Sequence, residues 1–267
     1  MKLQSFIVLF VCCLFIAPNA FSQSIPPSEA TAKDAIAKTP RHAEYADVAL
    51  PGSDTKIKCW VVYPETKDKA PVVIVIHEIF GMTDWVNSVA DAIAAEGFIA
   101  IAPDLISGKE GAKDNPREAI GNLTEEETIQ RLNAVRDYGL ALPSANGKFA
   151  TIGFCLGGRT SFLYATTQQK LSAAVVYYGN GPAPEKIASI TAPVQGHYGG
   201  DDARVNSTIP ETEAKMKELN KSFEPTIYEG AGHGFLRQQE GREGANLKAS
   251  QQAWPKTIEF LKKHTAN

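Results

Sequence analysis

Runs of apolar residues alternate with segments of helical periodicity along most of the chain. Short continuous apolar runs are typical of buried strands, and they occur at residues 57–63, 72–76, 98–102, 149–152, 173–178, 194–198 and 226–228. Apolar positions repeated at helical spacing predict amphipathic helices at residues 84–96, 125–141, 158–167, 210–222 and 245–264. Strands that alternate with helices predict an α/β fold, with a mainly parallel central sheet and helices on both faces.

The first 22 residues have a different pattern. Lys2 is followed by an unbroken apolar run over residues 6–17, and small residues surround Ala20 and Ser22. The run is too short to span a bilayer comfortably. Residues 1–22 are therefore predicted to be a secretory signal peptide, and the mature protein to be periplasmic or secreted without stable membrane association. An uncleaved N-terminal anchor is the alternative.

The rest of the chain is predicted to contain one large domain. Residues 23–45 show no clear period and are expected to be an N-terminal tail, so the domain is placed at residues 46–267. The chain has 43% apolar residues, enough for a full core. Its formal net charge of −3 provides no basic field, so nucleic-acid binding is not expected.

Signal cleavage would leave two of the four cysteines. Cys12 and Cys13 would be removed, while Cys59 and Cys155 would remain. Two cysteines of an exported protein normally suggest a disulfide. However, Cys59 lies in a predicted strand and Cys155 in a motif that needs a free thiol, so we expect the two to stay apart.

The strongest chemical signal is the segment Gly-Phe-Cys-Leu-Gly at residues 153–157, between a predicted strand and a predicted helix. This is the nucleophile-elbow pattern with cysteine in the serine position. Its glycines are needed because the turn is strained and closely packed. Cys155 would lie at a helix N-terminus, which favours a thiolate and an oxyanion. A buried structural cysteine in a glycine-rich turn is the alternative.

A triad on this fold needs an acid and then a histidine later in the chain. Asp201 and Asp202 follow the strand at 194–198, at the sheet edge where active sites collect. His233 follows in the glycine-rich loop at 230–234. His233 would accept the thiol proton, and Asp202 would fix its tautomer. Asp201 competes for the acid role, and either aspartate could be a turn-capping residue instead.

The loop after the strand at 72–76 supplies the second oxyanion N–H in this fold. Its carboxylate, Glu78, is unusual beside a cysteine nucleophile and is predicted to control the charge of the thiol. A solvated loop glutamate is the alternative. No metal site is predicted, because the pair His77 and Glu78 lacks the second histidine of a zinc helix.

Four motifs follow one another in the chain: Glu-Ile-Phe-Gly at 78–81, the elbow at 153–158, Gly-Gly-Asp-Asp at 199–202 and Ala-Gly-His-Gly-Phe at 231–235. With these motifs in this order, the sequence resembles the dienelactone hydrolase family. The resemblance covers roughly Val48 to the C-terminus. It implies an α/β-hydrolase with a Cys-His-Asp triad that cleaves small carboxylic esters or lactones without a metal or organic cofactor.

The resemblance also implies roles for individual residues. It selects Asp202 as the acid, and Glu78 matches the glutamate that pairs with the resting thiol and releases it when substrate arrives. Ile79 and Leu156 match the residues whose N–H groups form the oxyanion hole. Arg237 matches an arginine that binds the substrate carboxylate, with a solvated surface charge as the alternative.

Other features of the substrate site stay open. Candidates for a second carboxylate-binding arginine are Arg117, Arg131, Arg136 and Arg159. The polar segment at residues 108–124 is expected to shape the pocket. Alternative functions are a thioesterase or acyl hydrolase on the same site, or a non-catalytic binding or redox-sensing protein of the same fold.

Overall fold

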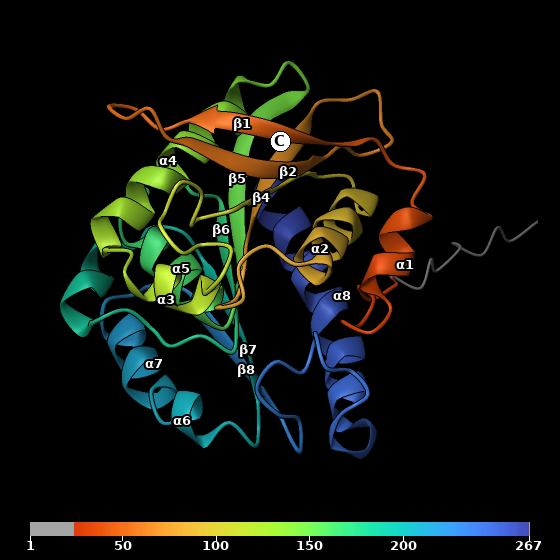
Figure 1. Cartoon of the computed structure of the whole chain (residues 1–267). Helices are drawn as coiled ribbons and strands as arrows, with labels where there is room; N and C mark the ends of the chain where they lie inside the picture. Colours follow the sequence, from red (N-terminus) through yellow and green to blue (C-terminus); the bar gives the residue numbers. More distant parts are fainter. Residues whose placement is uncertain (1–23, 267) are drawn as a thin grey trace, which may run out of the picture.

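A computed structural model describes residues 24–266. Their strands form one eight-stranded sheet (Figure 1). The spatial order is β1-β2-β4-β3-β5-β6-β7-β8, and the predicted signal peptide lies outside the described residues. Strand β2 is antiparallel to β1 and β4, while the other neighbouring pairs are parallel. The strands are β1 Ala43–Ala49, β2 Lys56–Val62, β3 Ala70–Ile76, β4 Ile99–Pro103, β5 Ala145–Phe154, β6 Ala173–Tyr177, β7 Val194–Gly199 and β8 Phe223–Tyr228.

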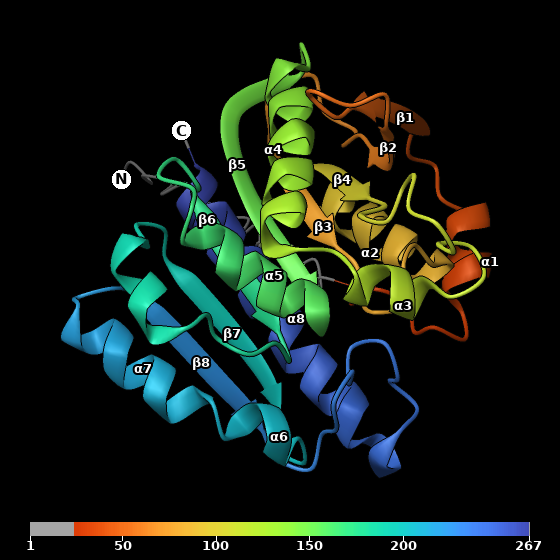
Figure 2. The same cartoon turned by 60° about the vertical axis from the view of Figure 1, so that its left-hand side comes forward.

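Helices cover both faces of this sheet (Figures 1 and 2). The helices α1 Ala32–Ala37, α2 Asp84–Ala95 and α8 Ala245–Thr265 lie on one face. The helices α4 Glu125–Ala141, α5 Leu156–Ala165 and α7 Ile209–Glu218 lie on the other. Shorter helices are α3 Pro116–Gly121, α6 Ala203–Asn206, η1 Pro184–Ser189 and η2 Arg242–Gly244. The structure thus confirms the predicted α/β-hydrolase arrangement of a mainly parallel sheet between two helical layers.

The continuous apolar run of β3 is explained by burial on both faces. Val73 and Val75 belong to the core beneath α2 and α8. Val72, Ile74 and Ile76 alternate with them and belong to the core beneath α4 and α5. Because successive side chains of a strand point to opposite faces, a strand covered on both sides needs an apolar residue at every position.

The segment expected to be a tail is structured from residue 24 onward. Its helix α1 packs against α2 with Ala32 fully buried, and its last residues enter β1. The segment also contacts a distant loop, because the Glu29 N–H donates to the Arg237 carbonyl (2.9 Å) and Gln239 donates to the Pro26 carbonyl (2.8 Å). A helix this short shows no period, and β1 is ordered by pairing with β2, so the local sequence gives no sign of either.

The polar segment at residues 108–124 contains α3. Asn115 caps this helix by accepting a hydrogen bond from the Glu118 N–H, and Pro116 occupies its first turn. A small apolar cluster separate from the two main cores holds α3, with Ile106, Ala119 and Ile120 at its centre. No helix within residues 24–266 is both long enough and apolar enough to cross a membrane.

Candidate active site

Cys155 lies at the sharp turn between β5 and α5. Its φ of 55° and ψ of −114° are strained for a residue with a side chain, and its N–H donates to the Tyr177 carbonyl (3.0 Å). A Cβ on Gly153 would lie 1.9 Å from the Gly157 carbonyl oxygen, and a Cβ on Gly157 would lie 2.2 Å from that of Ile76. The backbone can therefore make this turn only with glycine at both positions.

The surroundings of the Cys155 thiol favour its neutral form. Burial raises its pKa, and the negative charge of Glu78 raises it further. The N–H of Leu156 at the start of α5 and the charge of Arg204 act in the opposite direction but are outweighed. The helix N-terminus alone therefore does not produce a thiolate, and an activating base is needed.

Asp202 and His233 come from loops that follow adjacent parallel strands. Asp202 follows β7 and begins α6, where its side chain accepts a hydrogen bond from the Val205 N–H (3.4 Å). His233 lies in the loop after β8. Its Nδ1 is 2.5 Å from the Asp202 Oδ2, and the Asp202 side chain is only 7% exposed. A buried carboxylate therefore orients the imidazole, and Nε2 has no hydrogen-bond partner within residues 24–266.

The competing carboxylate, Asp201, points elsewhere. Its side chain is about half exposed and pairs with Arg242 (3.0 Å).

The other close neighbour of the imidazole is Tyr178, whose ring centre is 5.1 Å from that of His233. Tyr178 is buried, has a positive φ of 41°, and its hydroxyl has no hydrogen-bond partner among the described residues. Sequence reasoning gave it no role, because a tyrosine ending a strand carries no distinctive signal.

Glu78 does not hydrogen-bond to the Cys155 sulfur in the described part of the chain, in contrast to the pairing that the resemblance implied. Its buried carboxylate pairs with Arg237 instead, with 2.6 Å between Oε2 and Nε. Arg237 also pairs with Glu29 of the N-terminal segment. Burial raises the pKa of Glu78 to about 7, although Arg237 opposes the shift. Glu78 is thus a buried carboxyl that titrates near neutral pH beside the thiol.

A pocket of about 350 Å³ opens at Cys155. Ile79 and Leu156, the two predicted oxyanion donors, are in its wall together with Tyr178 and Asn180. The same wall contains three arginines, Arg117 from α3, Arg159 from α5 and Arg204 from α6. Within residues 24–266, none of the three guanidinium groups makes an ion pair or a side-chain hydrogen bond. The pocket therefore presents uncompensated positive charge next to the thiol.

The structure separates the arginine candidates. Arg117 and Arg159 line the pocket, whereas Arg131 donates to the Ser107 carbonyl (2.9 Å) and Arg136 pairs with Asp137 (2.7 Å). Arg237, expected at a substrate carboxylate, has its guanidinium engaged by two protein carboxylates. Arg204 was missed, although it lies two residues after Asp202. Its position near the acid was the available signal.

Comparison with known proteins agrees with this architecture. The model of the dienelactone hydrolase family matches residues 57–265. The chain belongs to the dienelactone hydrolase family. It is accordingly a hydrolase of esters or lactones, as the motifs predicted. The N-terminal segment that contacts Arg237 lies outside the part that matches the family.

Individual relatives span most of the chain. A Salmonella typhimurium protein named "Putative carboxymethylenebutenolidase" is 30% identical over 264 residues, covering 91% of this chain and 95% of the relative. A Bradyrhizobium protein named "Probable 2-oxo-3-(5-oxofuran-2-ylidene)propanoate lactonase" is 28% identical, covering 77% and 88%. The crystal structure of a dienelactone hydrolase-like promiscuous phosphotriesterase from metagenomic libraries has a TM-score of 0.71 at 23% identity, covering 84% and 98%, which supports the fold.

Two further features bear on the chemistry of the chain, namely its second described cysteine and its metal-binding side chains. Cys59 is a free, buried thiol in β2, and burial raises its pKa to about 12. Cys155 is also free. No group of three metal-binding side chains gathers within residues 24–266. The expectation that hydrolysis needs no cofactor stays a prediction.

Proposed function

We propose that this chain is a cysteine-dependent hydrolase of small carboxylic esters or lactones, with Cys155, His233 and Asp202 as its catalytic triad. The observation that carries the proposal is the strained turn that presents Cys155 to a pocket whose wall includes Tyr178, the ring neighbour of the His233 that pairs with Asp202. The two N–H groups proposed for the oxyanion belong to Ile79 and Leu156, in the wall of the same pocket.

In this mechanism, Nε2 of His233 accepts the thiol proton while the sulfur attacks the carbonyl carbon. The N–H groups of Ile79 and Leu156 stabilise the tetrahedral oxyanion. When the oxyanion collapses, the carbon–oxygen bond breaks and His233 returns the proton to the leaving alkoxide. A water molecule, deprotonated by His233, then hydrolyses the thioester and regenerates the thiol. Burial and the negative charge of Glu78 together keep the thiol neutral between turnovers.

The preferred substrates are proposed to carry a negative charge. Arg117, Arg159 and Arg204 line the pocket, and no carboxylate of residues 24–266 pairs with them. Guanidinium groups bind carboxylates through paired hydrogen bonds. Arg237 can take part in carboxylate binding only if its pairing with Glu78 or Glu29 changes.

The test is hydrolysis of a panel of activated esters and small lactones, each with and without a carboxylate. We expect kcat/KM of the Cys155→Ala variant to fall at least about 10³-fold, with an unchanged melting temperature. The matched control is Cys59→Ala in the other free thiol, for which activity per folded molecule should persist. Retained activity in Cys155→Ala, or equal rates on the charged and neutral esters, would contradict the triad or the charge preference respectively.

Export is a separate proposal that rests on the pattern of residues 1–22. The positive start, the apolar run and the small residues after it support a cleaved secretory signal. Cell fractionation followed by N-terminal sequencing tests it. A protein found in the cytoplasm with its first residues intact would overturn it.

A further inference from the structure

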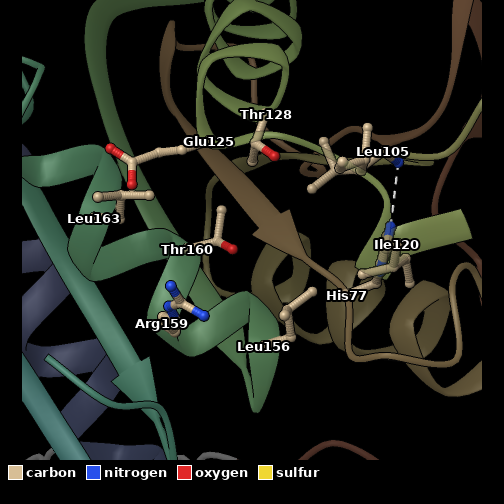
Figure 3. A pocket seen from close by; sticks show the side chains of 10 residues that line it. His77, Leu105, Ile120, Glu125, Thr128, Leu156, Arg159, Thr160 and Leu163 are labelled. Atoms are coloured by element: carbon tan, nitrogen blue, oxygen red, sulfur yellow. Dashed lines mark hydrogen bonds between the residues drawn. The ribbon is translucent and has the colours of Figure 1, made fainter. Parts of the chain in front are cut away.

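Figure 3 shows a second, smaller pocket, of about 110 Å³. It adjoins the pocket that opens at Cys155, because Leu156 and Arg159 line both. It is lined by α3 and the segment after it, by the start of α4, by α5, and by the segments after β3 and β4. Five of its ten lining side chains are aliphatic, namely Leu105, Ile120, Leu123, Leu156 and Leu163. We call it the side pocket.

Several polar groups of the side pocket are already satisfied by the protein. The two ring nitrogens of His77 are engaged by backbone groups at 2.7 and 3.1 Å, the second of these drawn in Figure 3. The Thr128 hydroxyl donates to the Thr124 carbonyl (2.9 Å), and the Glu125 carboxylate pairs with Lys186. These groups need no further partners, and Arg159 also lines the pocket at Cys155, where an anionic group would meet it. The aliphatic wall therefore favours an apolar occupant of the side pocket over a polar one.

The two pockets share part of their walls. Leu156 and Arg159, one turn apart on α5, line both of them. On α3, Arg117 lines the pocket at Cys155 while Ile120, three residues later, lines the side pocket. Residues three apart on a helix lie on one face. Two helices therefore each present an arginine and an aliphatic residue to neighbouring parts of one binding region.

We propose that the side pocket binds an apolar substituent of the substrate and sets its preferred length. The inference rests on the proposed function, because the substituent must belong to an ester or lactone whose carbonyl reaches Cys155. A water molecule takes up about 30 Å³, and a methylene group is of similar size. The cavity of about 110 Å³ therefore accepts a chain of about four carbon atoms. The substrate class is thus an ester or lactone with both an anionic group and a short alkyl substituent.

The experiment uses two series of carboxylate-bearing esters and the full chain. One series lengthens the acyl chain from two to eight carbons with a fixed alcohol, and the other lengthens the alcohol with a fixed acyl group. In one series, kcat/KM should rise about fourfold per methylene up to about four carbons and then fall. The series that responds identifies the side of the carbonyl that enters the side pocket. A monotonic or flat dependence in both series overturns the proposal.

A filling variant ties the length preference to this cavity. Leu163→Phe adds volume inside the side pocket, and Leu247→Phe makes the same change on the exposed surface of α8. Leu163→Phe should lower the ratio of kcat/KM for the four-carbon and two-carbon substrates at least tenfold, whereas Leu247→Phe should keep the wild-type ratio. Thr128→Leu fills the same cavity from α4 and replaces Leu163→Phe if that variant does not fold. An unchanged ratio in a folded filling variant overturns the proposal.

The two proposals fail differently. If hydrolysis depends on Cys155 but shows no length optimum, only the side-pocket proposal fails. If Cys155→Ala retains full activity, the proposed function fails and the side-pocket proposal fails with it.

Discussion

The turn at Cys155 and the ion-pair cluster of Glu78, Arg237 and Glu29 lie next to each other but are built in opposite ways. The turn comes from five consecutive residues, and backbone atoms crowd its glycine positions. The cluster joins three side chains from the N-terminal segment, the loop after β3 and the loop after β8. One is specified by local backbone geometry, and the other exists only when distant segments meet.

The position and the charge of the Cys155 sulfur are therefore set by different parts of the molecule. The turn fixes where the sulfur lies, because the carbonyls around Gly153 and Gly157 leave no space for a Cβ. The cluster influences the charge on the sulfur, because Glu78 raises the pKa of Cys155. Changes in the turn should therefore affect folding and activity together, while changes in the cluster should mainly shift pH dependence.

The largest effect is expected for Gly153→Ala. The added Cβ would lie 1.9 Å from the Gly157 carbonyl oxygen, so the free energy of unfolding should fall by about 4 kcal/mol or more and activity should be lost. Chemical denaturation and an ester assay measure the two quantities. Gly121→Ala is the matched control, because open space surrounds that position, and its stability should change by less than about 1 kcal/mol. Similar stabilities for the two variants would contradict the steric account.

An intermediate effect is expected for Glu78→Gln. Burial raises the pKa of Glu78 from 4.5 to about 7 in the folded protein, so between these pH values the folded state binds more protons than the unfolded state. The stability of the wild type should therefore fall, relative to Glu78→Gln, as pH rises from about 4.5 to about 7, by up to roughly 3 kcal/mol. Denaturation across this pH range measures the difference.

The same variant should change thiol reactivity. Removing the negative charge of Glu78 lowers the pKa of Cys155, so the alkylation profile of the thiol should move to lower pH. Catalysis should also be impaired, because Arg237 loses the buried carboxylate with which it pairs. Glu126→Gln on the exposed surface of α4 is the control and should leave both profiles unchanged. A Glu78→Gln profile that coincides with the wild type would show that Glu78 does not control the thiol.

The smallest effect is expected for Glu29→Gln. Its carboxylate is 57% exposed, so losing its ion pair should cost less than about 1 kcal/mol. The negative charge of Glu29 raises the pKa of Glu78, so the midpoint of the pH dependence assigned to Glu78 should move to lower pH. Comparing the stability profiles of Glu29→Gln and the wild type checks this. A midpoint that stays in place would mean that the N-terminal segment has no influence on Glu78.

The features that could be predicted from the sequence are those made by consecutive residues, and the features that could not are those made by distant segments. The strand β3 and the segment around Cys155 were predictable, because burial on both faces and a tight turn each constrain consecutive residues. The helix α1 was not, since it packs with the buried Ala32 against α2, far along the chain. The positions of Arg204 and Tyr178 in the pocket were missed for a similar reason, because neither belongs to a local motif.

The sequence by itself determined the α/β class, the family and the positions of the candidate nucleophile, acid and base, because strand periodicity and glycine-dependent turns act over a few neighbouring residues. The tertiary structure decided which charges are paired. Arg237 pairs with Glu78 and Glu29, whereas Arg117 and Arg159 have no carboxylate partner among the described residues. The physical reason is that electrostatic and packing interactions depend on distance in space, which the order of residues along the chain does not fix.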